Sequence, residues 1–314
     1  MSTDDNFNEF YNNTISSELL SLDKLRLAKK KKNFFLFLIN LAIVIAIWAL
    51  AVVIARGFSF DSDAVEVEIV IVLILTVLCF SFLLYFTKKN KNAYVAEYKD
   101  KIIARLVKFI EPSLEYHKDK QISRAQFVNS NIFHQTIDRL HGDDYVSGKI
   151  GQTEFEFSEI KAIHEEEYTD DDGNTRTKDV TVFKGLFFIA DFHKNFKGDY
   201  YVLPDKAERR FGSTIGKFFQ SLNKSRGQLI KMENLEFEKA FVVYGADQIE
   251  ARYILSSNMM EKILSVKKMF NKDIYISFTN QCINIAIPFK EDLFEPKYHR
   301  SIVNDKKTIE FFKL

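Results

Sequence analysis

The chain has 314 residues, of which 46% are hydrophobic and 28% are charged, and its formal net charge is +1. This balance argues against a general nucleic-acid-binding protein, because such proteins carry a basic excess that meets the phosphates. The two cysteines, Cys79 and Cys282, lie far apart in the sequence, which fits a reducing compartment better than a disulfide.

The N-terminal segment, residues 1–32, holds a predicted amphipathic helix and then a basic cluster. Apolar residues recur at three- and four-residue steps between Phe7 and Leu25, which places them on one helical face. This helix could pack against protein or lie on a membrane surface. Its acidic residues Glu9, Glu18 and Asp23 favour packing against protein.

Residues 33–89 contain two long apolar runs, at 34–55 and 68–87. The first run has 22 residues, and as a helix it would be about 33 Å long, against a hydrocarbon core of about 30 Å. A soluble core hairpin is disfavoured by two such runs, and a cleaved signal peptide by the presence of a second span. We expect a transmembrane hairpin in which Asn40 forms an interhelical hydrogen bond.

Basic residues are concentrated at the outer ends of this hairpin. The loop between the runs is acidic and carries only Arg56 as a basic residue. The positive-inside rule therefore predicts that both termini lie in the cytoplasm. A transport role is disfavoured, because no ionisable residue stands at mid-depth in either run. The basic residues before and after the hairpin are Lys24, Arg26, Lys29, Lys30, Lys31, Lys32, Lys88, Lys89 and Lys91.

The remaining chain predicts a helical connector, residues 90–135, and an α+β domain, residues 136–314. From Tyr145 onward apolar residues alternate with polar ones, which is typical of strands, and Gly173 with Asn174 predicts a hairpin turn. We expect an antiparallel meander with packed helices. The predicted strands lie at 146–150, 155–163, 180–192, 199–203, 236–244, 274–278 and 282–288, the last two forming a hairpin around Asn280-Gln281. The predicted helices lie at 93–110, 123–131, 215–222, 247–252, 259–270 and 306–313.

Motifs for catalysis are weak throughout the sequence. Residues 212–217 lack the first glycine and the hydroxyl residue of a phosphate-binding loop, and residues 170–172 lack the alternating acids of a calcium loop. Metal ligands could come together if two strands met, but no histidine or cysteine pair has zinc-site spacing. We expect no catalytic residue, no metal and no cofactor. The candidate ligands are His141, Asp143, Asp144, His164, Glu165 and Glu166.

Two other groups of polar residues are candidates for binding or for structure. The basic segment after Pro204 carries Lys206, Arg209, Arg210 and Lys217, which could contact anionic lipid or a protein partner. Asp247 and Glu250 have the spacing of a helix capping box, and with Arg252 they could form a structural clamp. Five aromatic residues are expected to fill the core: Phe187, Phe188, Phe192, Phe237 and Phe241.

Several segments carry a resemblance to a known family. They are Gly142-Asp143-Asp144-Tyr145, Gly148-Lys149-Ile150-Gly151, Phe155-Glu156-Phe157-Ser158-Glu159, Phe183-Lys184-Gly185-Leu186-Phe187, Ala190-Asp191-Phe192 and Asp247-Gln248-Ile249-Glu250-Ala251-Arg252-Tyr253. With them the chain resembles the bacterial domain-of-unknown-function family 3137. The resemblance implies a leading helix, two spans and a cytoplasmic domain, and it brings no reaction or cofactor.

The sequence therefore predicts a protein of the bacterial inner membrane whose cytoplasmic domain recruits a protein partner without catalysis. The alternative is a module that binds anionic lipid at the inner membrane surface. A metal-dependent hydrolase built around His141 and His164 is a third hypothesis.

Overall fold

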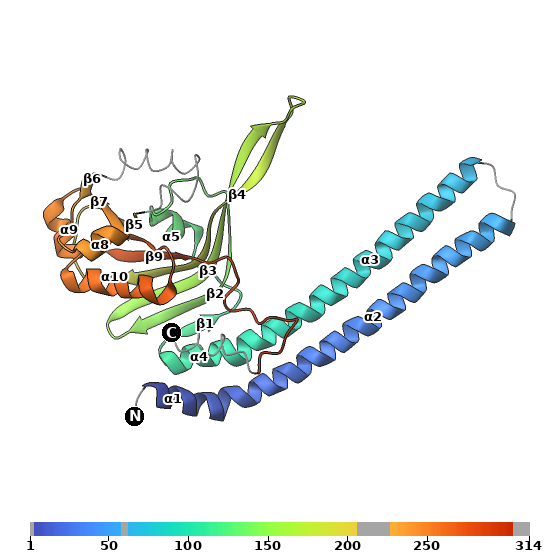
Figure 1. The fold of residues 1–314 in the computed structure, drawn as a ribbon, viewed down its shortest axis with the longest axis horizontal. Coiled ribbons are helices and arrows are strands. Elements are labelled where there is room, and N and C mark those ends of the chain that lie inside the picture. Colours follow the sequence, from blue (N-terminus) through green and yellow to red (C-terminus); the bar gives the residue numbers. More distant parts are fainter. Residues whose placement is uncertain (1–2, 58–61, 206–226, 304–314) are drawn as a thin grey trace. The chain divides into compact units, whose positions relative to one another are not determined.

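The structure is a computed structural model that describes residues 3–57, 62–205 and 227–303 (Figure 1). It forms two compact units, Met1–Ile103 with Glu295–Lys313, and Ala104–Phe294. The first is helical and holds the long apolar helices, and the second is a sheet with packed helices. The predicted α+β class is thereby confirmed. The helices predicted at 215–222 and 306–313 lie outside the described residues.

The helical unit consists of two long helices, each interrupted or extended by a π-helical turn. The first helix comprises α1 (Thr3–Phe10), η1 (Tyr11–Ile15) and α2 (Ser16–Gly57), and the second comprises α3 (Ser62–Tyr98) and η2 (Lys99–Ile103). The amphipathic segment thus continues directly into the first apolar run. With 42 residues, α2 is about 63 Å long and extends beyond a hydrocarbon core.

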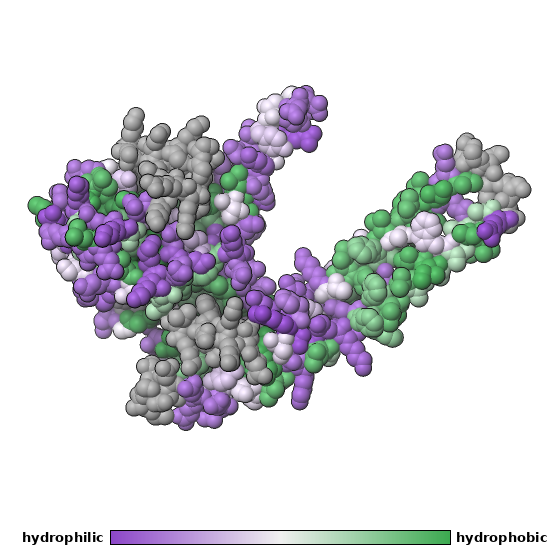
Figure 2. Space-filling model, viewed as in Figure 1, coloured by the Kyte–Doolittle hydropathy of each residue, from purple (hydrophilic) through white to green (hydrophobic). Residues whose placement is uncertain are grey.

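Both helices are long and apolar enough to cross a membrane. Their most apolar windows are 0% and 11% buried, whereas the core helix of a soluble protein would be mostly buried. Figure 2 shows a mostly green, apolar surface over the paired apolar parts of α2 and α3. Length, hydropathy and exposure together favour contact with lipid.

The N-terminal helix packs against protein along its predicted apolar face. Phe7, Ile15, Leu19 and Leu22 are buried there. Tyr94, Tyr98 and Ile102 of the second helix are also buried in this unit. Lys101 Nζ lies 3.9 Å from Glu18 Oε2 and forms an ion pair with it. Of the two alternatives for this helix, the structure therefore shows packing within the unit.

Polar side chains join α2 to α3. Asn40 Nδ2 donates to the carbonyl oxygen of Cys79 at 2.7 Å, which confirms the predicted interhelical hydrogen bond. Just before the first apolar run, Asn33 Oδ1 accepts a bond from Asn90, and Asn33 Nδ2 donates to the Tyr298 hydroxyl at 3.3 Å. The segment around Tyr298 is thereby attached to the helix pair.

The second unit is built on one nine-stranded sheet in which every described pair is antiparallel. The strand order is β1-β2-β3-β4-β9-β8-β5-β7-β6. The strands are β1 (Glu115–His117), β2 (Arg139–Ile150), β3 (Thr153–Thr169), β4 (Thr175–Asp191), β5 (Tyr200–Pro204), β6 (Gln228–Ile230), β7 (Phe241–Gly245), β8 (Tyr275–Thr279) and β9 (Cys282–Pro288). The helices are α4 (Ala104–Ile110), α5 (Arg124–Asn129), α8 (Leu235–Ala240), α9 (Gln248–Ile254) and α10 (Ser257–Phe270).

Only β1 to β4 form the predicted meander. The C-terminal hairpin β8–β9 inserts between β4 and β5, so the expectation of a simple meander is wrong. Close pairing of β4 with β9 depends on Gly185, since a Cβ there would lie 2.1 Å from the carbonyl oxygen of Ile287. The absence of a side chain lets the two backbones approach.

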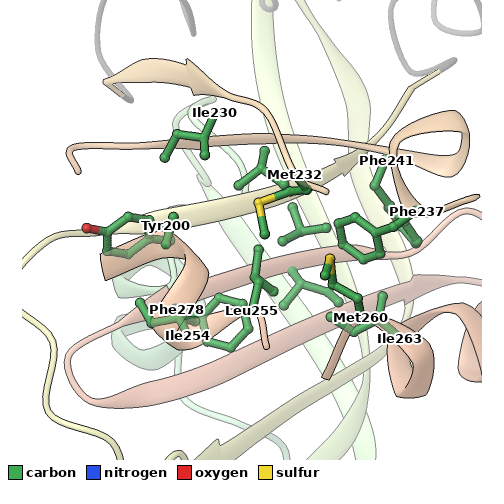
Figure 3. Close-up of a cluster of buried hydrophobic side chains, with 14 of the residues drawn as sticks. Tyr200, Ile230, Met232, Phe237, Phe241, Ile254, Leu255, Met260, Ile263 and Phe278 are labelled. Atoms are coloured by element: carbon green, nitrogen blue, oxygen red, sulfur yellow. The ribbon is translucent and has the colours of Figure 1, made fainter. Parts of the chain in front are cut away.

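Two apolar clusters cover the two faces of the sheet. Along β5, Tyr200 and Val202 belong to one cluster, and Tyr201 and Leu203 belong to the other. Alternate residues of a strand point to opposite faces, so the clusters lie on opposite sides. Figure 3 shows the first cluster, to which the helices α8 to α10 contribute Phe237, Ile254, Met260 and Ile263, and the turn after α9 contributes Leu255.

The five predicted core aromatics are confirmed as core or core-lining residues. Phe187, Phe237 and Phe241 are at most 2% exposed, and Phe188 and Phe192 pack against the first cluster. The predicted strand at 236–244 is wrong in its first half, which forms α8 before β7 begins. Asn234 starts this helix, because its side chain accepts bonds from the amides of Glu236 and Phe237.

Candidate functional site

A two-stranded ribbon, residues 164–180 and here named the arm, extends from the sheet. β3 and β4 pair along it from His164 and Val180 to Thr169 and Thr175. The neighbouring strands stop earlier, since β2 pairs with β3 only as far as Ile163 and β9 meets β4 only from Gly185. In Figure 1 the arm projects away from the body of the sheet.

A β-bulge marks the place where the arm leaves the sheet. Ala162 pairs with Phe183, but Ile163 pairs with Thr181, so Val182 is the extra residue on β4. A bulge bends the strand and increases its twist, which redirects the ribbon that follows.

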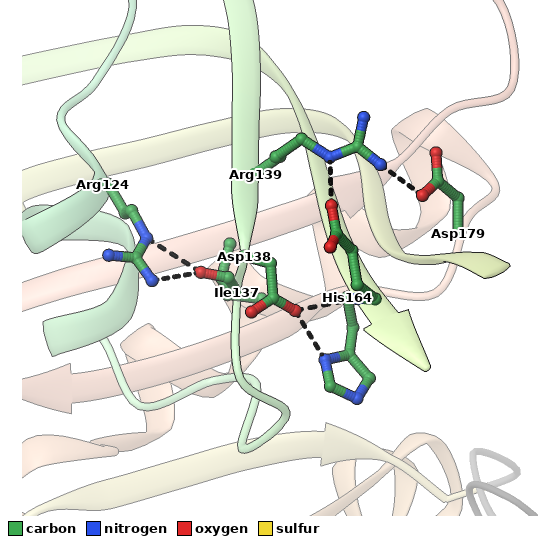
Figure 4. Close-up of polar contacts among 7 residues, drawn as sticks. Arg124, Ile137, Asp138, Arg139, His164 and Asp179 are labelled. Carbon is green, nitrogen blue, oxygen red and sulfur yellow. Dashed lines mark hydrogen bonds and ion pairs between the residues drawn. The ribbon is translucent and has the colours of Figure 1, made fainter. Parts of the chain in front are cut away.

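A polar network fixes the base of the arm (Figure 4). Asp138 Oδ2 lies 2.8 Å from His164 Nδ1 and accepts a hydrogen bond from the amide of Glu165, also at 2.8 Å. These two hydrogen bonds lower the pKa of the Asp138 carboxyl, and the bond from the Glu165 amide has the larger effect. Arg139 crosses the ribbon, because it pairs with Glu165 at 2.9 Å on β3 and with Asp179 on β4.

The arm is strongly acidic, and its charges are not all paired within it. Residues 164–180 contain seven Asp and Glu residues against one Arg and one Lys. Asp170 shapes the turn, since its side chain accepts from the amides of Asp172 and Asn174 and pairs with Arg176. Among the described residues, no ion pair forms with Glu167, Asp171 or Asp172, which are exposed near the tip. The tip therefore presents negative charge to solvent.

A cluster of three carboxylates lies where β2 and β3 pair. A second bulge, between Asp143 and Val146, leaves Asp144 in the left-handed region with a φ of 55°. Asp143 is opposite Glu159 in the register. One carboxylate oxygen from each of Asp143, Asp144 and Glu159 lies within 4.8 Å of the others.

Glu159 is the most unusual member of the cluster. It is 5% exposed, and its Oε2 accepts a bond from the amide of Leu293 at 3.1 Å. Its Oε1 is buried without a hydrogen-bond partner among the described residues. Burial, followed by the charges of Asp292, Asp143 and Asp144, raises the pKa of Glu159 to about 7. Asp144 is also buried and accepts a bond from the Tyr116 hydroxyl.

Only part of the predicted ligand set comes together. Asp143 and Asp144 meet Glu159, which was not among the candidate ligands, whereas His164 and Glu165 contribute to the base of the arm and Glu166 pairs with Lys178. His141 is exposed on β2. The partner Glu159 depends on strand register and a bulge, and the sequence signals neither directly.

Asp247, Glu250 and Arg252 occupy different places around α9. The Asp247 side chain caps the helix by accepting from the amide of Glu250 at 2.7 Å. The Glu250 carboxylate accepts from the amides of Lys197 and Gly198, both at 3.0 Å, and from the Tyr200 hydroxyl at 2.7 Å. Arg252 forms its ion pair with Glu233 at 3.8 Å, between two exposed side chains. Glu250 thus ties α9 to the segment before β5.

The other predicted contact residues, Lys206, Arg209, Arg210 and Lys217, lie outside the described residues.

A pocket of about 380 Å³ opens elsewhere on the sheet and is lined in part by Tyr145, Glu156, Asp191 and Cys282. Burial and the nearby charges of Asp191 and Glu156 raise the pKa of the Cys282 thiol. A raised pKa keeps the sulfur protonated and weakens it as a nucleophile.

Comparison with protein families finds a match to the C-terminal part of the chain. The model of the family described as "Protein of unknown function (DUF3137)" matches residues 181–314. Comparison with curated proteins gave no match, and comparison with solved structures gave none either. The matched part contains Glu250 and its donors but not Asp143, Asp144 or Glu159. The match over residues 181–314 supports the resemblance to this family, whose function is unknown, that is seen in the sequence.

Proposed function

We propose that the protein is integral to a membrane and that its sheet unit is a non-catalytic docking module for a basic protein partner. In this proposal α2 and α3 span the inner membrane of a bacterial cell, both termini are cytoplasmic, and the arm contacts the partner. The observation that carries the proposal is the arm itself, with its exposed acidic tip.

The arm is longer than the fold of the sheet requires. Its six cross-strand pairs, from His164–Val180 to Thr169–Thr175, extend past both neighbouring strands, and most of its side chains are exposed. Charge on free strand edges also prevents aggregation, which is the simplest alternative role. Edge protection, however, does not require the exposed ring of Tyr168, 42% accessible beside the tip. Tyrosine is enriched in protein interfaces and among the residues that contribute most to binding.

The pKa shifts of two potentially reactive groups, the Glu250 carboxyl and the Cys282 thiol, support a non-catalytic function. Three donors engage the Glu250 carboxylate, which lowers its pKa and stabilises the ionised form. The raised pKa of the Cys282 thiol disfavours the thiolate. Both groups therefore favour a structural role.

Site-specific photocrosslinking of the full-length protein in intact cells tests the docking module. A photoreactive residue at Tyr168 on the arm should give a discrete protein adduct, and the same residue at exposed Leu235 serves as the matched control outside the arm. Charge reversal of Glu167, Asp171 and Asp172 to lysine should remove the adduct, because these side chains supply the unpaired charge. Adducts that are equal at Tyr168 and Leu235, or that survive the charge reversal, would contradict the proposal.

A second candidate function is recognition of anionic lipid. The observation that favours it is a set of exposed lysines flanking the apolar helices, each contributing about 1 kcal/mol near an anionic surface. Native mass spectrometry of the detergent-purified full chain tests it. Bound anionic lipid that is lost when these lysines become glutamine would support lipid recognition, while the Tyr168 adduct would remain. The lysines are Lys30, Lys31, Lys32, Lys88, Lys89 and Lys91.

A further inference from the structure

We propose that Asp143, Asp144 and Glu159 form a binding site for one divalent cation of the class that prefers oxygen ligands. The site lies between β2 and β3 of the second unit, apart from the arm tip, and it is independent of the proposed docking function. Two observations support it: the convergence of the three carboxylates and the unpartnered, buried oxygen of Glu159.

The geometry of the three carboxylates suits a single ion. Their oxygens lie within 4.8 Å of one another. Ligands at opposite sides of one calcium ion are separated by roughly 4.6–5.2 Å, since each Ca–O bond measures about 2.3–2.6 Å. The three oxygens can therefore contact one ion with little movement of the backbone.

The burial of Glu159 distinguishes this cluster from a group of exposed acidic residues. Glu159 is only 5% exposed, and its Oε1 has no hydrogen-bond partner among the described residues. A buried oxygen without a partner costs free energy that a ligand at this position would recover. Since Oε2 is held by the Leu293 amide, the carboxylate is fixed in place beside the two aspartates.

The surroundings of the cluster resemble the outer shell of a metal site. The Tyr116 hydroxyl donates to Asp144 Oδ1 and so orients this carboxylate. The left-handed φ of Asp144 turns its side chain out of the regular strand alternation. Gly142 keeps the strands close, because a Cβ there would lie 2.3 Å from the carbonyl oxygen of Glu159.

The chemical type of the three ligands indicates which class of ion would bind. Carboxylate oxygens are hard ligands, which suit Ca²⁺, Mg²⁺ and Mn²⁺ rather than the softer ions that histidine and thiolate bind. Both predicted histidines, His141 and His164, lie outside the cluster. Calcium tolerates irregular geometry best, and we therefore expect it to bind at least as tightly as magnesium.

Isothermal titration calorimetry on the full chain in detergent, after treatment with a chelator, tests the site. Calcium, magnesium and manganese chloride are titrated separately. At least one cation should bind saturably with a stoichiometry near one. Glu159→Gln preserves the shape of the side chain and removes its charge, and it should weaken binding by more than about tenfold.

Matched variants separate loss of the site from loss of the fold. Glu154→Gln, on the same strand but 69% exposed and paired with Lys149, should bind as the wild type does. Asp143→Asn, at a half-buried position, is a second variant expected to weaken binding. Circular dichroism checks that each variant is folded. Absence of saturable binding by all three cations, or binding that Glu159→Gln and Asp143→Asn leave unchanged, would overturn the proposal.

Discussion

Glu250 shows how one side chain can hold two elements together. It lies in the first turn of α9 and accepts bonds from Lys197, Gly198 and Tyr200, which precede or begin β5. The Tyr200 hydroxyl is the largest cause of its lowered pKa, and the two amides add to it. The folded protein therefore favours the ionised carboxylate.

This preference makes the stability dependent on pH in the acid range. A carboxyl whose pKa is lowered on folding contributes stability above its unfolded pKa, about 4.3, and loses it as pH falls through the folded value. Glu250→Gln should lower the free energy of unfolding at pH 7 and flatten its decline below about pH 5. Urea unfolding of the full chain in detergent at a series of pH values measures both effects. Glu261→Gln, at an exposed position of α10, is the control. An unchanged acid slope in Glu250→Gln would contradict this account.

At the same scale, the sequence supplied part of the candidate cluster. Asp143 and Asp144 are adjacent and acidic, so they were recognisable as candidate ligands. Glu159 was not, because its position opposite Asp143 depends on the pairing of β2 with β3 and on the bulge that follows Asp143. A shift of one residue would turn Glu159 to the other face of the sheet.

At the scale of elements, periodicity predicted most strands but misassigned α8. The alternation of Glu236, Phe237 and Glu238 satisfies the strand pattern, yet the same residues lie in one helical turn with only Phe237 buried. Asn234 decides the outcome, since its side chain caps the two amides that a helix leaves free. A short apolar pattern therefore did not distinguish the two structures.

The cap can be tested by substitution. Asn234→Ala should lower the free energy of unfolding by about 1 kcal/mol, whereas Asn234→Asp should retain most of the stability because aspartate caps equally well. Urea unfolding of the full chain in detergent measures the difference. Equal losses in the two variants would show that the cap does not stabilise α8.

Local sequence patterns do not predict the order of the strands in the sheet. The hairpin of β8 and β9 was predicted from alternation and from Asn280-Gln281, both of which have positive φ values in the turn. Its insertion between β4 and β5 depends on contacts such as the approach of Gly185 to Ile287, which are remote in sequence. Local periodicity fixes which face a residue occupies but not which strand lies beside it.

At the scale of the whole molecule, the two units differ in how much apolar surface they expose. The long helices expose large apolar side chains such as Phe35, Val53 and Leu78, all more than half accessible. The sheet unit instead buries large aromatic residues such as Phe237 and Phe187 on the two faces of the sheet. Exposed apolar surface of this extent on two long helices is unfavourable in water and favourable in a bilayer.

The proposed topology follows from the charges at the ends of these helices and can be measured directly. With Cys79 and Cys282 replaced by serine, a single cysteine is introduced either at Ser62, at the start of α3, or at Tyr168 on the arm. In intact cells an impermeant maleimide should label Ser62→Cys alone, because the positive-inside rule retains the lysine-rich ends and the sheet unit in the cytoplasm. After lysis both positions should be labelled, which controls for reactivity. Labelling of Tyr168→Cys in intact cells would reverse the orientation and would exclude a cytoplasmic partner for the arm.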